Sequence, residues 1–176
     1  MLLDTPVCNF GWQAPDFTLK DPAGKAHTMR AAMGQKGLMV AFICNHCPYV
    51  KRIAQNMAED FNALHTEGMG IVAIMANDYH KYPDDSPDNM QRFALLHGFC
   101  FPYLVDEDQS VAKAYGAVCT PDFFGFNADG ALQYRGRFEN PMTGEHDLLL
   151  AMRQVALTGA GPKDQTASMG CSIKWR

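Results

Sequence analysis

An uninterrupted apolar run at residues 38–43, followed at once by two cysteines, constrains the fold of this chain more than any other feature. The run, LMVAFI, has no polar position, as expected of a central strand buried on both faces of a parallel sheet. After Cys44 and Cys47, apolar residues recur at helical spacing as far as Gly68. The sequence therefore places two thiols where a buried strand ends and a helix begins.

This position favours a chemical role for the two thiols over packing. A helix N-terminus offers unpaired backbone N–H groups and partial positive charge, which stabilise a thiolate and lower the pKa of a cysteine. Two thiols separated by two residues at such a point can form and break a disulfide. His46, which lies between them, would add to thiolate stabilisation when protonated; the alternatives are a solvated His46 and an idle buried pair.

The rest of the chain alternates strand and helix patterns. A turn signal at residues 21–25 predicts an N-terminal hairpin, and Asn127-Ala128-Asp129-Gly130 predicts a second one. Further strands are predicted at 71–75 and 101–105, and helices at 86–97, 110–115 and 148–157. Because parallel neighbours need right-handed crossover helices, we expect a β-α-β-α-β-β-α order around a mixed sheet with helices on both faces.

Composition limits what the chain can be. Its 176 residues, 47% hydrophobic, predict a single domain over 1–176, with a core at about 10–159 and a tail, 160–176, that folds back through Ile173 and Trp175. The net charge of −4 and the absence of a basic run argue against nucleic acid as a partner. No signal-like or membrane-length apolar segment occurs, so we expect no membrane contact and a cytoplasmic location, where thiols are kept reduced.

Five short motifs carry a resemblance to a known family. They are Ala14-Pro15-Asp16-Phe17, C-N-H-C-P-Y-V from Cys44, C-T-P-D-F-F from Cys119, Y-R-G-R from Tyr134 and G-C-S-I-K-W from Gly170. Together they resemble the thioredoxin superfamily, and within it the peroxiredoxin-like branch (AhpC/TSA, redoxin type), over about residues 10–176. The resemblance implies an α/β thioredoxin-like fold, in which a central mixed β-sheet is flanked by helices and extended by the N-terminal β-hairpin.

The resemblance also implies roles for individual residues. In thioredoxin-like proteins the first cysteine of the pair is the exposed nucleophile and the second resolves the mixed disulfide, positions that Cys44 and Cys47 match. Pro121 matches the cis proline that faces the disulfide, and Thr120 would offer backbone groups to a bound peptide. Asn45 and His46 would shape the site. A protonated His46 beside Cys47 would stabilise the thiolate and so make the disulfide more oxidising than that of thioredoxin, whose reduction potential is roughly −270 mV. No cofactor beyond the dithiol is implied.

Departures from the family pattern decide between two activities. Thioredoxins have a buried acid six positions before the first cysteine, where this chain has Leu38. If the peroxide-attacking cysteine of peroxiredoxins is aligned with Cys47, Cys44 replaces their peroxide-polarising threonine. Their arginine has no counterpart beside Pro121, although Arg135 and Arg137 are candidate anion contacts. We therefore predict a thiol–disulfide oxidoreductase acting on protein or low-molecular-weight thiols and disulfides, recharged by an unidentified reductase, with a thiol-dependent peroxidase as the alternative.

A third hypothesis is a soft-metal carrier rather than an enzyme. Cys44, His46 and Cys47, with Cys119 or Cys171, would supply enough ligands for zinc or copper(I), although one C-x-x-C is weak evidence and no metal site is assigned. Cys119 and Cys171 are also candidate third thiols in a redox role. Their alternatives are a small buried hydrophobe for Cys119 and tail anchoring for Cys171.

A cluster of acids lies around the start of the helix predicted at 86–97. Asp84, Asp85 and Asp88, with His80, could in principle hold a cation. Their spacing is irregular, and acids beside a helix start usually interact with its N-terminus. We therefore expect a structural role for them.

Overall fold

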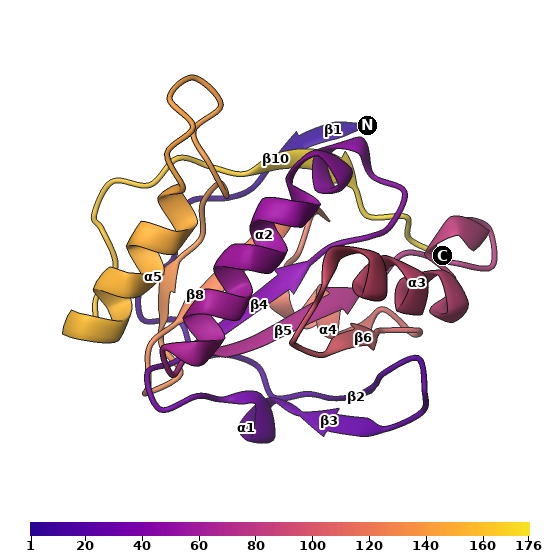
Figure 1. The fold of residues 1–176 in the computed structure, drawn as a ribbon, viewed down its shortest axis with the longest axis horizontal. Helices are drawn as coiled ribbons and strands as arrows, with labels where there is room; N and C mark the ends of the chain where they lie inside the picture. Colours follow the sequence, from indigo (N-terminus) through magenta and orange to yellow (C-terminus); the bar gives the residue numbers. More distant parts are fainter.

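The computed structural model describes residues 1–176, and its main element is a seven-stranded mixed sheet in the order β3-β2-β6-β5-β4-β8-β9 (Figure 1). Its strands are β2 (Thr18–Lys20), β3 (Ala26–Thr28), β4 (Leu38–Phe42), β5 (Gly70–Met75), β6 (Tyr103–Val105), β8 (Asp122–Phe126) and β9 (Leu132–Tyr134). Strand β4 pairs in parallel with β5 and antiparallel with β8, and β5 pairs in parallel with β6. The predicted N-terminal hairpin, β2–β3, is confirmed.

Helices cover both faces of this sheet. They are α1 (Met29–Ala32), α2 (Pro48–Thr66), α3 (Pro87–His97), α4 (Ser110–Tyr115) and α5 (Asp147–Thr158), with a short 3-10 turn, η1 (Pro83–Asp85), before α3. Side chains of β4 alternate between two buried clusters: Met39 and Ala41 pack with α2, α3 and α5, whereas Val40 and Phe42 pack with α4. Burial on both faces explains why the strand has no polar position. The predicted α/β thioredoxin-like class is confirmed.

A second, three-stranded sheet was not expected from the sequence. It joins β1 (Leu2–Asp4), β10 (Met169–Ser172) and β7 (Cys119–Thr120), all antiparallel, in the order β1-β10-β7. In Figure 1, β1 and β10 lie side by side at the end of the main sheet where α2 begins. The tail thus folds back as a strand, with Ile173 buried and Trp175 40% exposed. None of the helices combines the length and apolarity needed to cross a bilayer.

Candidate redox site

The two cysteines lie at the junction between β4 and α2. Cys44 follows the strand after Ile43, and Cys47 is the N-cap residue of α2. Pro48 lies in the first turn of α2, where a backbone N–H has no acceptor within the helix, so the N–H that proline lacks costs no hydrogen bond. Both thiols are free in this structure. The resemblance implies an exposed Cys44, but Cys44 is 1% and Cys47 0% exposed. The expected position at a strand-to-helix junction is found, and the expected exposure is not.

Thr120 contacts both sulfurs. Its peptide bond to Pro121 is cis, as the resemblance predicts. Thr120 Oγ1 lies 3.4 Å from Cys44 Sγ, and the thiol of Cys47 donates a hydrogen bond to the Thr120 carbonyl oxygen at 3.1 Å. The segment that contains the cis proline therefore lies against the dithiol, although its residues are separated from the cysteines by more than 70 positions in the chain.

The two thiols share charge unequally. A hydrogen bond with Cys47, desolvation and the negative charge of Asp85 raise the pKa of Cys44 well above its ordinary value. The pKa of Cys47 is lowered, first by the hydrogen bond from Cys44 and then by the N–H of Val50 in the first turn of α2. Loss of one proton from the pair therefore leaves the charge mainly on Cys47, with Cys44 protonated.

A buried carboxylate holds the loop between the cysteines. Asp85, fully buried in η1, accepts hydrogen bonds from the backbone N–H groups of Asn45 at 2.8 Å and His46 at 3.3 Å. It also accepts a bond from Asn77 Nδ2 at 2.9 Å and lies 2.6 Å from His46 Nδ1. The side-chain oxygen of Asn45 accepts a further bond from the Tyr103 hydroxyl at 3.0 Å. Asn45 and His46 are thus held in position from two other elements.

Asp85 has a structural role, as expected for the acidic cluster, but it acts on the loop between the cysteines and not on the N-terminus of α3. Only Asp88 lies in the first turn of α3, whereas Asp85 turns inward beneath the cysteine loop. His46 is not a freely solvated loop residue either, because its ring also stacks on Tyr82 with a centroid distance of 5.7 Å. The local sequence contains no signal for this contact, since it joins segments about 40 positions apart.

Three side chains that could bind a metal ion lie close together in the structure. One ligand atom each from Cys44, His46 and Asp85 lies within 4.8 Å of the others. Zinc takes such sulfur, nitrogen and oxygen ligands, but a closed structural site needs a fourth one. Neither Cys119 nor Cys171, the fourth ligands expected from the sequence, belongs to this group.

The two candidate third thiols differ in their surroundings. Cys119 is fully buried, donates to the Pro121 carbonyl oxygen at 3.6 Å, and has its pKa raised to about 12 by burial. Its thiol therefore stays protonated, as for a small buried hydrophobe. Cys171 is partly exposed and lies directly opposite Thr120 in the pairing of β10 with β7.

The two candidate anion contacts are both engaged within the protein. Arg135, 9% exposed, donates to Asp122 from Nε at 3.3 Å and from Nη2 at 2.9 Å, and to the Gly116 carbonyl oxygen at 2.9 Å. It is thus unavailable to a substrate anion, contrary to expectation. Arg137 is less enclosed, but its Nε donates to Asp147 at 2.6 Å.

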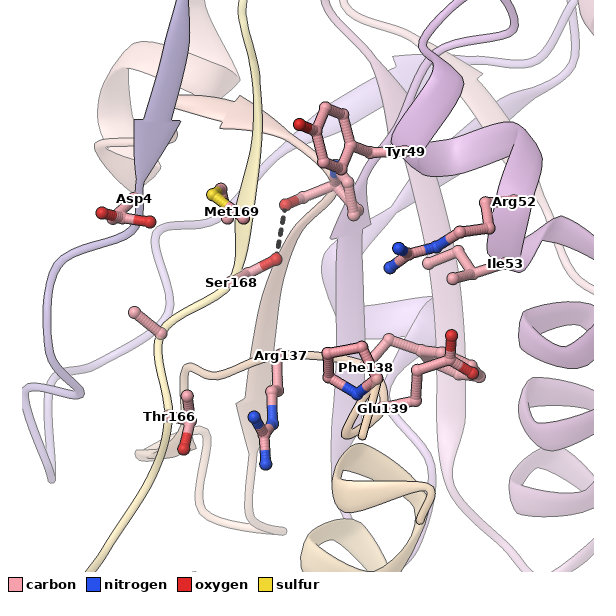
Figure 2. Close-up of a pocket in the computed structure, with 13 residues that line it drawn as sticks. Asp4, Tyr49, Arg52, Ile53, Arg137, Phe138, Glu139, Thr166, Ser168 and Met169 are labelled. Carbon is pink, nitrogen blue, oxygen red and sulfur yellow. Dashed lines mark hydrogen bonds between the residues drawn. The ribbon is translucent and has the colours of Figure 1, made fainter. Parts of the chain in front are cut away.

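A cavity of about 450 Å³ opens beside Pro121 (Figure 2). Its walls come from the first turns of α2, the loop after β9 and the segment that leads into β10, and they include Tyr49, Arg52, Arg137, Glu139 and Ser168. In Figure 2 the guanidinium of Arg52 points into the space between these walls. No carboxylate lies within ion-pair distance of Arg52, a cation that the sequence did not single out.

The family profile of AhpC/TSA proteins matches residues 10–135, most of the chain. The chain belongs to the AhpC/TSA family. The thiol-disulfide oxidoreductase ResA of Halalkalibacterium halodurans is 28% identical, covering 73% of this chain and 69% of its own. A Mycobacterium tuberculosis protein named as a peroxiredoxin is 24% identical, covering 70% and 73%. This AhpC/TSA chain spans about two thirds of the length of the ResA relatives that it matches.

Two solved structures are similar over nearly the whole chain. An uncharacterized conserved protein from Geobacillus kaustophilus is 38% identical with a TM-score of 0.91, covering 100% of this chain and 97% of its own. A hypothetical protein from Sinorhizobium meliloti is 36% identical with a TM-score of 0.91, covering 98% of each chain. A thiol:disulfide interchange protein of Chlorobium tepidum, 17% identical with a TM-score of 0.67 over 86% of this chain and 99% of its own, shares the fold.

Proposed function

We propose that the protein is a thiol–disulfide oxidoreductase whose Cys44 and Cys47 cycle between dithiol and disulfide. The observation that carries the proposal is the thiol pair at the start of α2, whose two sulfurs both contact Thr120. The ResA relatives, named as enzymes of this class, support it. Reduction of a substrate disulfide would transfer two electrons from the pair and leave a Cys44–Cys47 disulfide with two reduced substrate thiols.

Thr120 explains how the attacking thiolate forms. With the proton on Cys44, the charge on Cys47 is stabilised by the α2 amide of Val50. With the proton on Cys47, that thiol donates to the Thr120 carbonyl oxygen, and the Thr120 hydroxyl is placed to donate to a Cys44 thiolate. A proton shift within the pair therefore creates the nucleophile on Cys44. Cys44 then attacks the substrate, and Cys47 resolves the mixed disulfide.

The cavity beside Pro121 is where we place the substrate. Its volume of about 450 Å³ lies within the usual range for small-ligand pockets. It therefore suits a low-molecular-weight disulfide or the residues that flank a cysteine in a protein substrate. Since neither sulfur is exposed, exchange requires a local displacement of the segments that cover the pair. The reductase that recharges the pair is unidentified, and the cytoplasmic location stays a prediction from the sequence.

A thiol-dependent peroxidase is the second candidate, favoured by the low pKa of Cys47 and by membership of the AhpC/TSA family. Against it, Cys44 stands where peroxiredoxins have their threonine, and the buried Arg135 is fully engaged by Asp122. Disulfide exchange therefore fits the described contacts better.

The decisive experiment measures turnover of a small disulfide and of hydrogen peroxide with single variants. We expect Cys44→Ser to abolish disulfide turnover and Cys47→Ser to accumulate mixed disulfides, visible by mass spectrometry. Cys119→Ser is the matched control, because it removes a buried thiol nearby without touching the pair. Wild-type peroxide turnover by the Cys47→Ser protein would contradict the resolving role, and full disulfide turnover by Cys44→Ser would contradict the proposed function.

A further inference from the structure

The dithiol has almost no access to solvent, although disulfide exchange requires a direct approach to sulfur. Cys44 is 1% and Cys47 0% exposed. Strand β10, from the C-terminal tail, packs against the cluster that contains both cysteines. This strand carries a third thiol, Cys171, which is partly exposed. The element that covers the pair therefore presents a sulfur of its own to the solvent.

The strand register places the third thiol on the side of the pair. Cys171 lies opposite Thr120 in the antiparallel pairing of β10 with β7, and directly opposed side chains lie on the same face, about 5 Å apart at Cβ. The Thr120 side chain on that face reaches to within 3.4 Å of Cys44 Sγ. Cys119, one residue earlier in β7, points to the opposite face. Its thiol instead donates to the Pro121 carbonyl oxygen.

Cys171 packs against the apolar cluster that contains Cys47. Its backbone N–H helps to lower the pKa of Cys47, and burial together with the nearby Cys47 raises the pKa of Cys171. Three cysteines therefore lie around Thr120, two of them buried and the third partly exposed. We propose that Cys171 is a third redox thiol, which moves the disulfide from the covered pair to the surface by forming a Cys47–Cys171 disulfide. This inference rests on the proposed function, because it needs a Cys44–Cys47 disulfide as its starting state.

Each step of this relay is a balanced thiol–disulfide exchange. The Cys171 thiolate attacks Cys47 Sγ of the Cys44–Cys47 disulfide, forming Cys47–Cys171 and releasing Cys44 as a thiolate, which takes up a proton. An external thiolate then attacks Cys171 Sγ, forms a mixed disulfide and releases the Cys47 thiolate. A second external thiolate attacks the external sulfur of that mixed disulfide, releasing an external disulfide and the Cys171 thiolate. Two electrons pass from two external thiols to the pair.

The electrostatics give the relay a direction. Burial, the hydrogen bond with Cys47 and the negative charge of Cys47 raise the pKa of Cys171, whereas Lys174 and the N-terminal amino group act in the opposite sense. In the oxidised protein Cys47 carries no charge, so two of the three causes that raise the pKa disappear. Cys171 is thus a weak nucleophile while the pair is reduced and a better one when the pair needs reduction.

Trapping tests the geometry. In a Cys44→Ser protein, Cys47 can form an internal disulfide only with another cysteine near it. After oxidation with diamide under native conditions, we expect peptide mass mapping to recover Cys47 joined to Cys171. A Cys44→Ser/Cys119→Ser protein should give the same product, and the exposed Cys100 is replaced throughout to prevent cross-linking between molecules. Circular dichroism shows whether the Cys44→Ser protein is folded. If it is folded and Cys47 stays unpaired or is joined to Cys119, the proposal is overturned.

Kinetics test the relay itself. The wild-type and Cys171→Ser proteins are first oxidised. Formation of the Cys44–Cys47 disulfide in both proteins is a separate test of the proposed function. Reduction by millimolar glutathione is then followed by quenched alkylation. We expect Cys171→Ser to be reduced about tenfold more slowly, because an intramolecular thiol acts at a far higher effective concentration. Cys119→Ser should match the wild type. Equal rates for the wild-type and Cys171→Ser proteins would overturn the relay while leaving the disulfide pair established.

Discussion

Asp85 Oδ2 lies 2.6 Å from His46 Nδ1, and this contact ties the loop between the two cysteines to a turn 39 residues further along the chain. The carboxylate is fully buried and has no lysine or arginine partner, so the imidazole is its nearest basic group. Thioredoxins supply a buried acid from the strand before their cysteines. Here Leu38 occupies that position, and an acid reaches the site from a different element.

Replacing this carboxylate should make Cys44 more acidic. The negative charge of Asp85 is one cause of the raised pKa of Cys44, so Asp85→Asn should lower that pKa. In a Cys47→Ser background, where Cys44 titrates without its partner, alkylation of Cys44 at neutral pH should become about tenfold faster. The measurement is the alkylation rate as a function of pH.

Asp84→Asn is the control for this comparison. Asp84 belongs to the same short turn but is exposed, and it does not contact either sulfur. Its replacement should leave the pH profile of Cys44 unchanged. Equal shifts in the two variants would mean that the effect comes from general surface charge rather than from the buried carboxylate.

The unequal charge on the pair should appear in the reduction potential. Reduction of the disulfide adds two electrons, and the product takes up one proton if Cys47 stays ionised or two if both thiols are protonated. Because the pKa of Cys47 is lowered and that of Cys44 raised, the potential near neutral pH should fall by about 30 mV per pH unit rather than about 59 mV. Redox titration between pH 6 and 8 measures this slope. A slope near 59 mV across that range would contradict the assignment of charge to Cys47.

Local patterns were sufficient to predict the main sheet and the position of the dithiol. Six consecutive apolar residues, Leu38 to Ile43, allow little but a strand buried on both faces, and Pro48 directly after Cys47 marks a helix start. Those two signals locate Cys44 and Cys47 without any information from the rest of the chain. The cis bond before Pro121 came from the family motif rather than from physical reasoning.

Contacts between distant segments could not be predicted in this way. Strands β1 and β10 are three and four residues long, too short for a hydrophobic period to identify them in the sequence. Each is stabilised by pairing with the other, from opposite ends of the chain. The same holds for Asp85, whose partners at Asn45 and His46 leave no trace in the sequence around it. Burial of the sulfurs follows from these contacts, which is why Cys44 was wrongly expected to be exposed.

The ion pair between Arg135 and Asp122 should be a structural element rather than a substrate contact. Asp122 is fully buried, and the Arg135 guanidinium also packs over the Phe124 ring at 4.3 Å. Arg135→Met leaves an unpaired buried carboxylate and should lower the free energy of unfolding by about 3–5 kcal/mol. Arg153→Met, which breaks an exposed pair with Glu67, should cost less than about 1 kcal/mol. Denaturant unfolding compares the two; similar losses would show that burial does not distinguish these pairs.

Arg52 should select anionic substrates if the cavity beside Pro121 receives them. Its guanidinium points into that cavity and has no carboxylate within ion-pair distance, so a substrate carboxylate can pair with it (Figure 2). Arg52→Met should lower kcat/KM for glutathione disulfide by about fivefold, the effect of losing one partly exposed ion pair, and leave the neutral hydroxyethyl disulfide unaffected. Lys51→Met removes a neighbouring cation on α2 that does not line the cavity, and should change neither value. If Lys51→Met lowers turnover of glutathione disulfide as much as Arg52→Met does, the preference reflects the overall charge of the helix, and the substrate does not dock in this cavity through Arg52.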